Sequence, residues 1–118
     1  MSNSVTEIEF THLMLAGCDR LDREVGYRPT RFRRMVGELG GAEAVRRLLG
    51  GSDASDGFTT LWEAGRLDLS VEAYALRPRF ASLFSETERA VAQRRLVAHG
   101  FDVDAFLIDQ PGATDDGR

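Results

Sequence analysis

Apolar residues recur at helical spacing along the first part of the chain. The first set begins after a capping-box spacing between Ser4 and Glu7 and stops at Gly26, a residue type that suits a helix end. Its single apolar face is made of Phe10, Leu13, Met14, Cys18, Leu21 and Val25. The pattern predicts a helix over residues 6–25.

Two more helices are predicted before residue 50. Pro29 is tolerated in a first helical turn, and Gly40-Gly41 supplies the end of the helix that it opens. The apolar stripe between them consists of Phe32, Met35, Val36 and Leu39. A short third helix over residues 42–49 is expected to bury Ala44, Val45, Leu48 and Leu49.

The middle of the chain is richer in glycine and polar residues. The run over residues 50–57 predicts a loop, and apolar positions 58, 61 and 62 then indicate a brief helix closed by Gly65. Residues 66–69 alternate polar and apolar, which fits an extended connector or one short strand.

Two serines mark the last predicted helices. Ser70 can cap a helix over residues 71–76, before Pro78 breaks the pattern. A second capping-box spacing begins at Ser85 and opens a helix that runs to about residue 99. The inward positions predicted for this helix are Val91, Leu96 and Val97. Apolar residues between 101 and 108 are expected to dock on the core.

These elements predict an all-α fold, a compact bundle of about five to seven short helices, with a short extended segment near 66–69 as an option. A length of 118 residues suits one domain. We expect that helical domain to cover residues 1–108. Residues 109–118 are predicted to be a disordered acidic tail, because they combine aspartate, proline and glycine without apolar residues that could pack.

Charge and cysteine content narrow the class of protein. The net charge is −4, and residues 102–118 account for all of it with five aspartates and one arginine, so the rest of the chain is neutral. A single cysteine, Cys18, excludes an internal disulfide and a zinc site of several thiolates. Neither a targeting signal nor an apolar run near the ~20 residues of a membrane helix is visible. The predicted location is cytoplasmic.

Arginines gather at the start of the second predicted helix. Arg28, Arg31, Arg33 and Arg34 lie close together without an intervening acid. Arginine presents paired donors that match phosphate or carboxylate oxygens. The binding surface predicted for a protein or nucleic acid consists of Tyr27, Arg28, Thr30, Arg31, Arg34, Trp62 and Arg66. The alternative is a solvated helix face whose arginines pair with Asp19, Asp22, Glu24 or Glu38. The chain contains no lysine, and its use of arginine alone as a basic residue also fits the codon usage of a GC-rich genome.

The segment from Phe58 to Gly65, followed by Ser70, also allows a helix-turn-helix interpretation. The match is poor, because Arg66 stands where an apolar residue should pack and the reading helix would lack a basic residue before Arg77. Trp62 is the only tryptophan and is expected in the core or at its edge.

Catalytic chemistry has little support in the sequence. Glu63, Asp68 and Glu72 could work as acid–base carboxylates, but a glycine turn separates them, and ion pairs with arginine are simpler. His12 and Cys18 are six residues apart, a separation that does not stack them on one helix face. No metal site, cofactor or phosphate-binding glycine loop is predicted.

The motifs YRPTRF (27–32), GG (40–41), SDGFTTLWE (55–63) and GRLDLSVE (65–72) resemble a family of small, uncharacterised bacterial helical domains. Its members occur alone or appended to restriction-type and other DNA-processing proteins. The resemblance covers residues 10–101. It implies an accessory role near DNA processing or phage defence, and it implies no catalytic residues.

The leading hypothesis is therefore a non-enzymatic accessory module that binds a protein or a nucleic acid through Tyr27–Arg34 and the neighbouring surface of Ser55–Asp68. One alternative is a small hydrolase or nuclease-like enzyme that uses Glu63, Asp68 and Glu72. Another is a structural homodimer without a ligand.

Overall fold

The computed structural model describes residues 4–51 and 56–108, and the predicted tail at 109–118 lies outside them. Within these ranges the chain is all-α, as predicted, and contains no strand. The elements are α1 (Val5–Val25), α2 (Thr30–Leu39), α3 (Gly41–Leu49), α4 (Asp56–Glu63), the 3₁₀ segment η1 (Leu67–Leu69), α5 (Val71–Ala75), the 3₁₀ segment η2 (Pro78–Leu83), α6 (Glu86–Ala98) and α7 (Val103–Ile108).

The predicted serine caps are confirmed. Ser4 and Ser85 each accept a hydrogen bond through Oγ from the backbone N–H three residues on, and the carboxylate of the glutamate at that position accepts one from the serine backbone N–H. Ser70 accepts from the Ala73 N–H and so caps α5. These caps satisfy backbone N–H groups that have no partner within the first turn of a helix. Because each cap involves residues only three positions apart, the starts of α1, α5 and α6 could be predicted from the local sequence.

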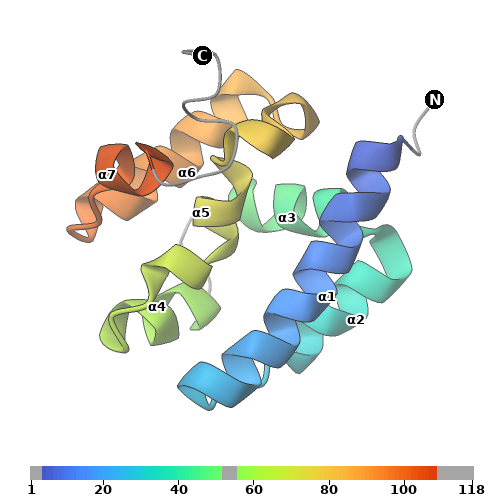
Figure 1. The fold of residues 1–118 in the computed structure, drawn as a ribbon, viewed down its shortest axis with the longest axis horizontal. Helices are drawn as coiled ribbons and strands as arrows, with labels where there is room; N and C mark the ends of the chain where they lie inside the picture. The colour runs from blue at the N-terminus through green and yellow to red at the C-terminus, as the bar shows by residue number, and fades with distance from the viewer. Residues whose placement is uncertain (1–3, 52–55, 109–118) are drawn as a thin grey trace.

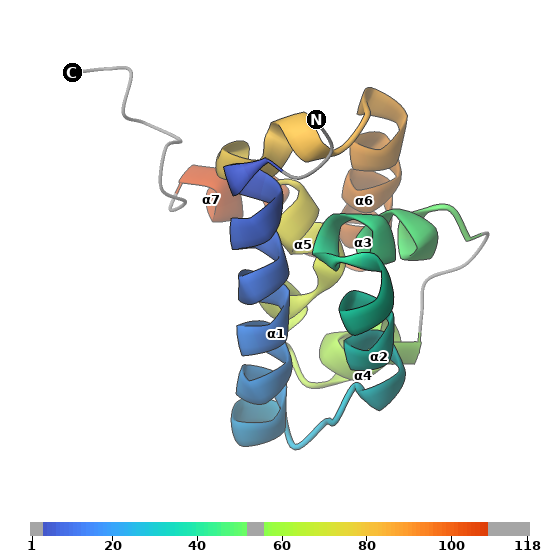
Figure 2. The ribbon, with the colours of Figure 1, turned by 90° about the vertical axis from the view of Figure 1, so that its right-hand side faces the viewer.

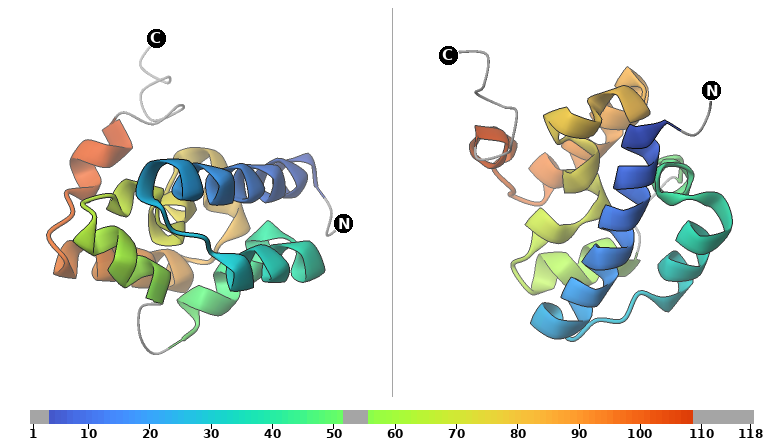
Figure 3. Two further views of the ribbon diagram at one scale, coloured as in Figure 1. Left: turned by 90° about the horizontal axis from the view of Figure 1, so that it is seen from below. Right: turned by 45° about the vertical axis from the view of Figure 1, so that its right-hand side comes forward.

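The short helix α5 lies near the centre of the molecule, and the other elements surround it (Figure 1). The long helix α1 runs beside α2, and the residues that join them cross one end of the pair (Figure 2). The right-hand view of Figure 3 shows α1 standing between α2 on one side and the chain around α4 and α5 on the other. Four consecutive residues of the central segment, Glu72–Ala75, are buried.

The core consists of two clusters of buried side chains. One joins α1, α3 and the η2 region, where Phe10 packs edge-on against Phe80 and Phe84 with ring centroids 5.0 and 5.4 Å apart. The other joins α4, η1, α6 and α7 and contains Phe58, with Leu96 fully buried. Leu76 packs against both clusters and connects them.

The optional extended segment near 66–69 is wrong, because residues 67–69 form a 3₁₀ turn. The Leu69 N–H donates to the Arg66 carbonyl at 3.0 Å, and the Ser70 N–H donates to the Leu67 carbonyl at 3.1 Å. A lone strand would leave these groups without a ladder partner, whereas the turn satisfies them locally. Both Leu67 and Leu69 are still buried, which explains the alternating pattern.

The inward face of α6 also differs from the prediction. Ala92 and Leu96 are fully buried, whereas Val97 is 56% exposed. Arg95 takes the neighbouring inward position, because its guanidinium bonds to groups of α3 and α5. Because an arginine takes an inward position, the spacing of the apolar residues alone does not indicate which face of α6 is buried.

Candidate functional site

A cavity of about 320 Å³ opens between α1, α2, α4 and the η1–α5 segment. We call it the main cavity. Most of its wall is apolar, and the elements contribute to it separately: Met14, Cys18 and Leu21 from α1, Phe32 and Met35 from α2, Phe58 and Leu61 from α4, and Val71 and Tyr74 from α5. Its size and apolar walls match those of small-ligand pockets, which start near 300 Å³.

The exposed polar side of the main cavity comes from the predicted arginine cluster. Tyr27, Arg28, Thr30 and Arg31 all line it, together with Pro29. Three of these, Arg28, Thr30 and Arg31, are exposed, whereas Met14 and Cys18 on the opposite wall are almost fully buried. The cavity therefore has a basic, exposed mouth and a buried, mostly apolar interior.

The four arginines of the cluster differ in their ion pairs. Arg33 bonds to Asp19 at 2.6 Å, and Arg28 bonds through Nε to Asp22 at 3.3 Å while its side chain stays 77% exposed. Arg31 and Arg34 make no ion pair within the described ranges 4–51 and 56–108. The alternative of a solvated, paired face thus describes Arg33 and Arg28, and it leaves Arg31 without an ion pair among the described residues at the cavity mouth.

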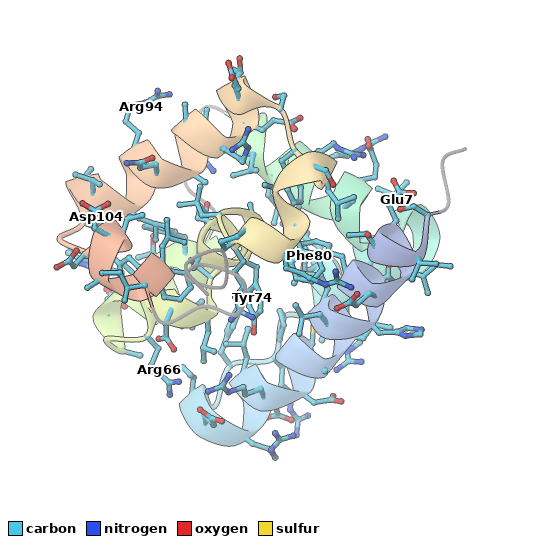
Figure 4. All side chains as sticks on the ribbon, turned by 45° about the horizontal axis from the view of Figure 1, so that its top comes forward. Glu7, Arg66, Tyr74, Phe80, Arg94 and Asp104 are labelled. Carbon is cyan, nitrogen blue, oxygen red and sulfur yellow. The ribbon has the colours of Figure 1, made fainter. Side chains whose placement is uncertain are left out.

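Three of the seven predicted binding residues lie away from the main cavity. Arg34 does not line it. Arg66 is bonded to Glu24 at 3.0 Å and to Asp68 at 3.1 Å, and Figure 4 shows it at the edge of the molecule. Trp62 is not in the core: it is 48% exposed and packs edge-on against His99, with ring centroids 5.0 Å apart.

A buried ion pair joins the cavity wall to α6. Glu72 is 1% exposed and lines the cavity, and its Oε2 accepts a hydrogen bond from Arg95 Nη1 at 3.1 Å. Arg95 also donates to the carbonyl oxygens of Leu48 and Gly51, at 3.1 and 2.8 Å. Burial raises the pKa of the Glu72 carboxyl, although its own backbone N–H and Arg95 favour the ionised form. This network joins α3, α5 and α6.

The candidate catalytic carboxylates do not converge. Glu63 is exposed on α4, Asp68 bonds to Arg66, and Glu72 is buried against Arg95. Across the described residues, no three His, Cys, Asp or Glu side chains are placed to hold a metal ion. Burial raises the pKa of the Cys18 thiol, which disfavours the thiolate form that a nucleophile or a metal ligand needs.

The helix-turn-helix interpretation is wrong for this segment. The presumed reading helix is α5, whose residues 72–75 are buried in the middle of the molecule. Figure 4 shows Tyr74 pointing from α5 toward α1, and an alanine side chain built at Gly17 would lie 3.7 Å from its hydroxyl oxygen. A helix enclosed in this way cannot enter a DNA groove.

Sequence reasoning missed the inner wall of the cavity. Phe32 and Met35 were expected to be ordinary core residues, and they are half-buried because they face the cavity. Gly17 had no assigned role, and it lines the cavity from α1. No local signal distinguishes these residues from core, since the cavity exists only where four separate elements meet.

No protein-family model, curated protein sequence or solved structure matches this chain. The resemblance to a bacterial helical domain family therefore stays a prediction. None of the helices that the structure describes has the length and apolar character needed to cross a membrane.

Proposed function

We propose that this chain is a cytoplasmic, non-enzymatic binding module whose binding site is the main cavity with its basic mouth. One observation carries the proposal: four residues predicted from sequence to bind a partner, Tyr27, Arg28, Thr30 and Arg31, line the same mostly apolar cavity. Apolar walls supply affinity by releasing water, and arginines at the mouth select an anionic partner.

A protein partner fits this site better than nucleic acid does. Sequence-tolerant nucleic-acid binding needs a broad basic surface that follows the phosphates. Here Arg33 and Arg66 are paired with acids, and the body of the chain is neutral. An acidic segment with apolar side chains can use both the mouth and the interior. An accessory role in DNA processing, which the family resemblance implies, is compatible with such a protein contact.

Two arginines of α2 provide a matched test. Arg31 lines the main cavity and Arg34 does not, although both are exposed and lie one helical turn apart. We expect Arg31→Glu to abolish affinity capture of the partner from the native host and Arg34→Glu to leave it nearly unchanged. Both substitutions should alter stability by no more than about 0.5 kcal/mol, because the sites are exposed.

Capture should be followed by mass spectrometry and repeated at increasing salt. A protein retained by wild type and by the Arg34 variant, lost in the Arg31 variant and weakened by salt agrees with the proposal. Equal capture by all three forms would remove the main cavity as the binding site. A gel shift with DNA and RNA on the same variants tests the nucleic-acid alternative, and the mass in solution tests the homodimer.

A further inference from the structure

We propose that the main cavity binds an anionic amphiphile, namely a small molecule with a carboxylate head and an apolar chain of about ten carbons. The head would lie at the mouth beside Arg31 and Arg28, and the chain would fill the interior. This inference rests on the proposed function for the location of the site, and it assigns a small-molecule occupant to the main cavity; the acidic protein segment is the other occupant, which the experiments below distinguish from it.

The interior determines the size and polarity of the chain. The whole cavity, mouth included, has a volume of about 320 Å³ and holds on the order of ten groups of about the size of a water molecule, at about 30 Å³ each, the carboxylate head among them. Met14, Cys18, Leu61 and Tyr74 on its walls are all less than 5% exposed. Such walls offer few hydrogen bonds to water, so displacement of this water by an apolar chain is favourable.

The mouth determines the charge of the head. Arg28 and Arg31 line it, and α2 begins there without an acidic residue in its first turn and without a side-chain cap. Of the described residues that line the cavity, only Glu72 is acidic; its Oε2 is paired with Arg95, and its Oε1 has no hydrogen-bond partner among the described residues. The mouth therefore favours an anion and opposes a cation.

A monoanion suits this mouth better than a phosphate dianion. Arg28 already shares its charge with Asp22, at 3.3 Å from Nε, whereas Arg31 makes no ion pair among residues 4–51 and 56–108. One unshared guanidinium can bind one carboxylate through two parallel hydrogen bonds. We therefore assign a carboxylate head.

Calorimetric titration of the full chain with straight-chain carboxylates tests this assignment. Hexanoate, octanoate and decanoate should bind one per chain, with affinity rising about fourfold per methylene, the equivalent of ~0.8 kcal/mol of buried CH₂. Chains much longer than ten carbons should gain little more. Decylammonium, which has the same chain and the opposite charge, should bind at least about tenfold more weakly, since one charge-assisted contact is worth that much.

Two pairs of variants locate the ligand. Arg31→Gln should weaken decanoate binding about tenfold and Arg34→Gln should not, because only Arg31 lines the cavity. Gly17→Leu should block the interior, whereas Gly37→Leu adds the same side chain to α2 at a site with no atom within 4 Å. Thermal unfolding of each variant checks folding, and Gly17→Ala replaces Gly17→Leu if the larger side chain unfolds the protein.

Three results would overturn the inference. They are no saturable binding of decanoate to wild type, equal binding of decanoate and decylammonium, and equal binding by the Arg31 and Arg34 variants. If decanoate fails to bind but the Arg31→Glu variant still loses a protein partner, the small-ligand assignment is wrong and the proposed function stands. If decanoate binds as expected and no protein is captured, the cavity is a small-molecule site alone.

Discussion

Replacing Arg95 with methionine is expected to destabilise the protein by about 3–5 kcal/mol, because it leaves a buried carboxylate without its counter-charge. Glu72 is 1% exposed and its Oε1 has no hydrogen-bond partner among side chains of the described residues, so Arg95 is the one cation paired with this carboxylate in that part of the chain. The carbonyl oxygens of Leu48 and Gly51 would lose a donor as well. Urea unfolding monitored by circular dichroism measures the loss.

Arg94 is the matched control. It is the adjacent arginine on α6, and Figure 4 shows it pointing away from the molecule. Arg94→Met should change stability by no more than about 0.5 kcal/mol. The double variant Glu72→Met with Arg95→Met should be more stable than Arg95→Met alone, since it removes the unpaired charge. Equal effects of the two single arginine variants would contradict a structural role for the pair.

The effect of Arg95→Met should also depend on pH. Burial raises the folded-state pKa of Glu72 above its ordinary value of 4.5, so the folded protein holds this proton more tightly than the unfolded chain does. The contribution of Glu72 to stability is then highest at low pH and decreases as the pH rises through the raised pKa. Without Arg95 the folded-state pKa of Glu72 should rise further, so the decrease in stability should extend to higher pH, and the loss of stability relative to wild type should be larger at pH 7 than near pH 5.

Gly41→Ala is expected to destabilise the protein by about 1–3 kcal/mol, because the added methyl group overpacks a helix contact. A Cβ at Gly41 would lie 2.9 Å from Thr11 Cα, 3.1 Å from Met14 Cγ and 3.2 Å from Phe10 Cδ2. The nearest of these atoms is backbone, so α1 itself would have to shift. The Gly41 N–H also donates to Thr11 Oγ1 at 2.9 Å, and this bond depends on the same close approach.

Gly37→Ala is the comparison for this change. Gly37 lies inside α2, and a Cβ there would meet no atom within 4 Å. Alanine in such a position should stabilise the helix by about 0.5–1 kcal/mol. Thermal unfolding should therefore move in opposite directions for the two glycine-to-alanine variants. A Gly41→Ala variant that is as stable as wild type or more stable would show that the α1–α3 contact is not tight.

Features set by neighbouring residues could be predicted from the sequence. The capping boxes at Ser4 and Ser85, the Ser70 cap and the stop at Gly65 all depend on hydrogen bonds within a few residues. Gly40 was expected to end a helix, and it does so with φ of 86°. Such local interactions determine where a helix begins or ends almost independently of how the rest of the chain packs around it.

Features set by distant residues could not be predicted. Glu72 and Arg95 are 23 residues apart, and their pairing decides which face of α6 turns inward. Gly41 looked like part of a helix stop, and its contact with Thr11 depends on how two helices pack. For the binding site, the sequence indicated the residues at the mouth, and the apolar interior behind them required the assembled fold.

Site-specific photo-crosslinking shows directly whether a partner binds at the main cavity. A benzophenone amino acid would replace Thr30, which is exposed and lines the cavity, or Arg94, which is exposed on α6 away from it. After irradiation in cells of the native host, adducts would be identified by mass spectrometry. The account predicts an adduct at position 30 that is absent at position 94. An adduct at position 94 alone, equal adducts at both positions, or none at position 30 would contradict it.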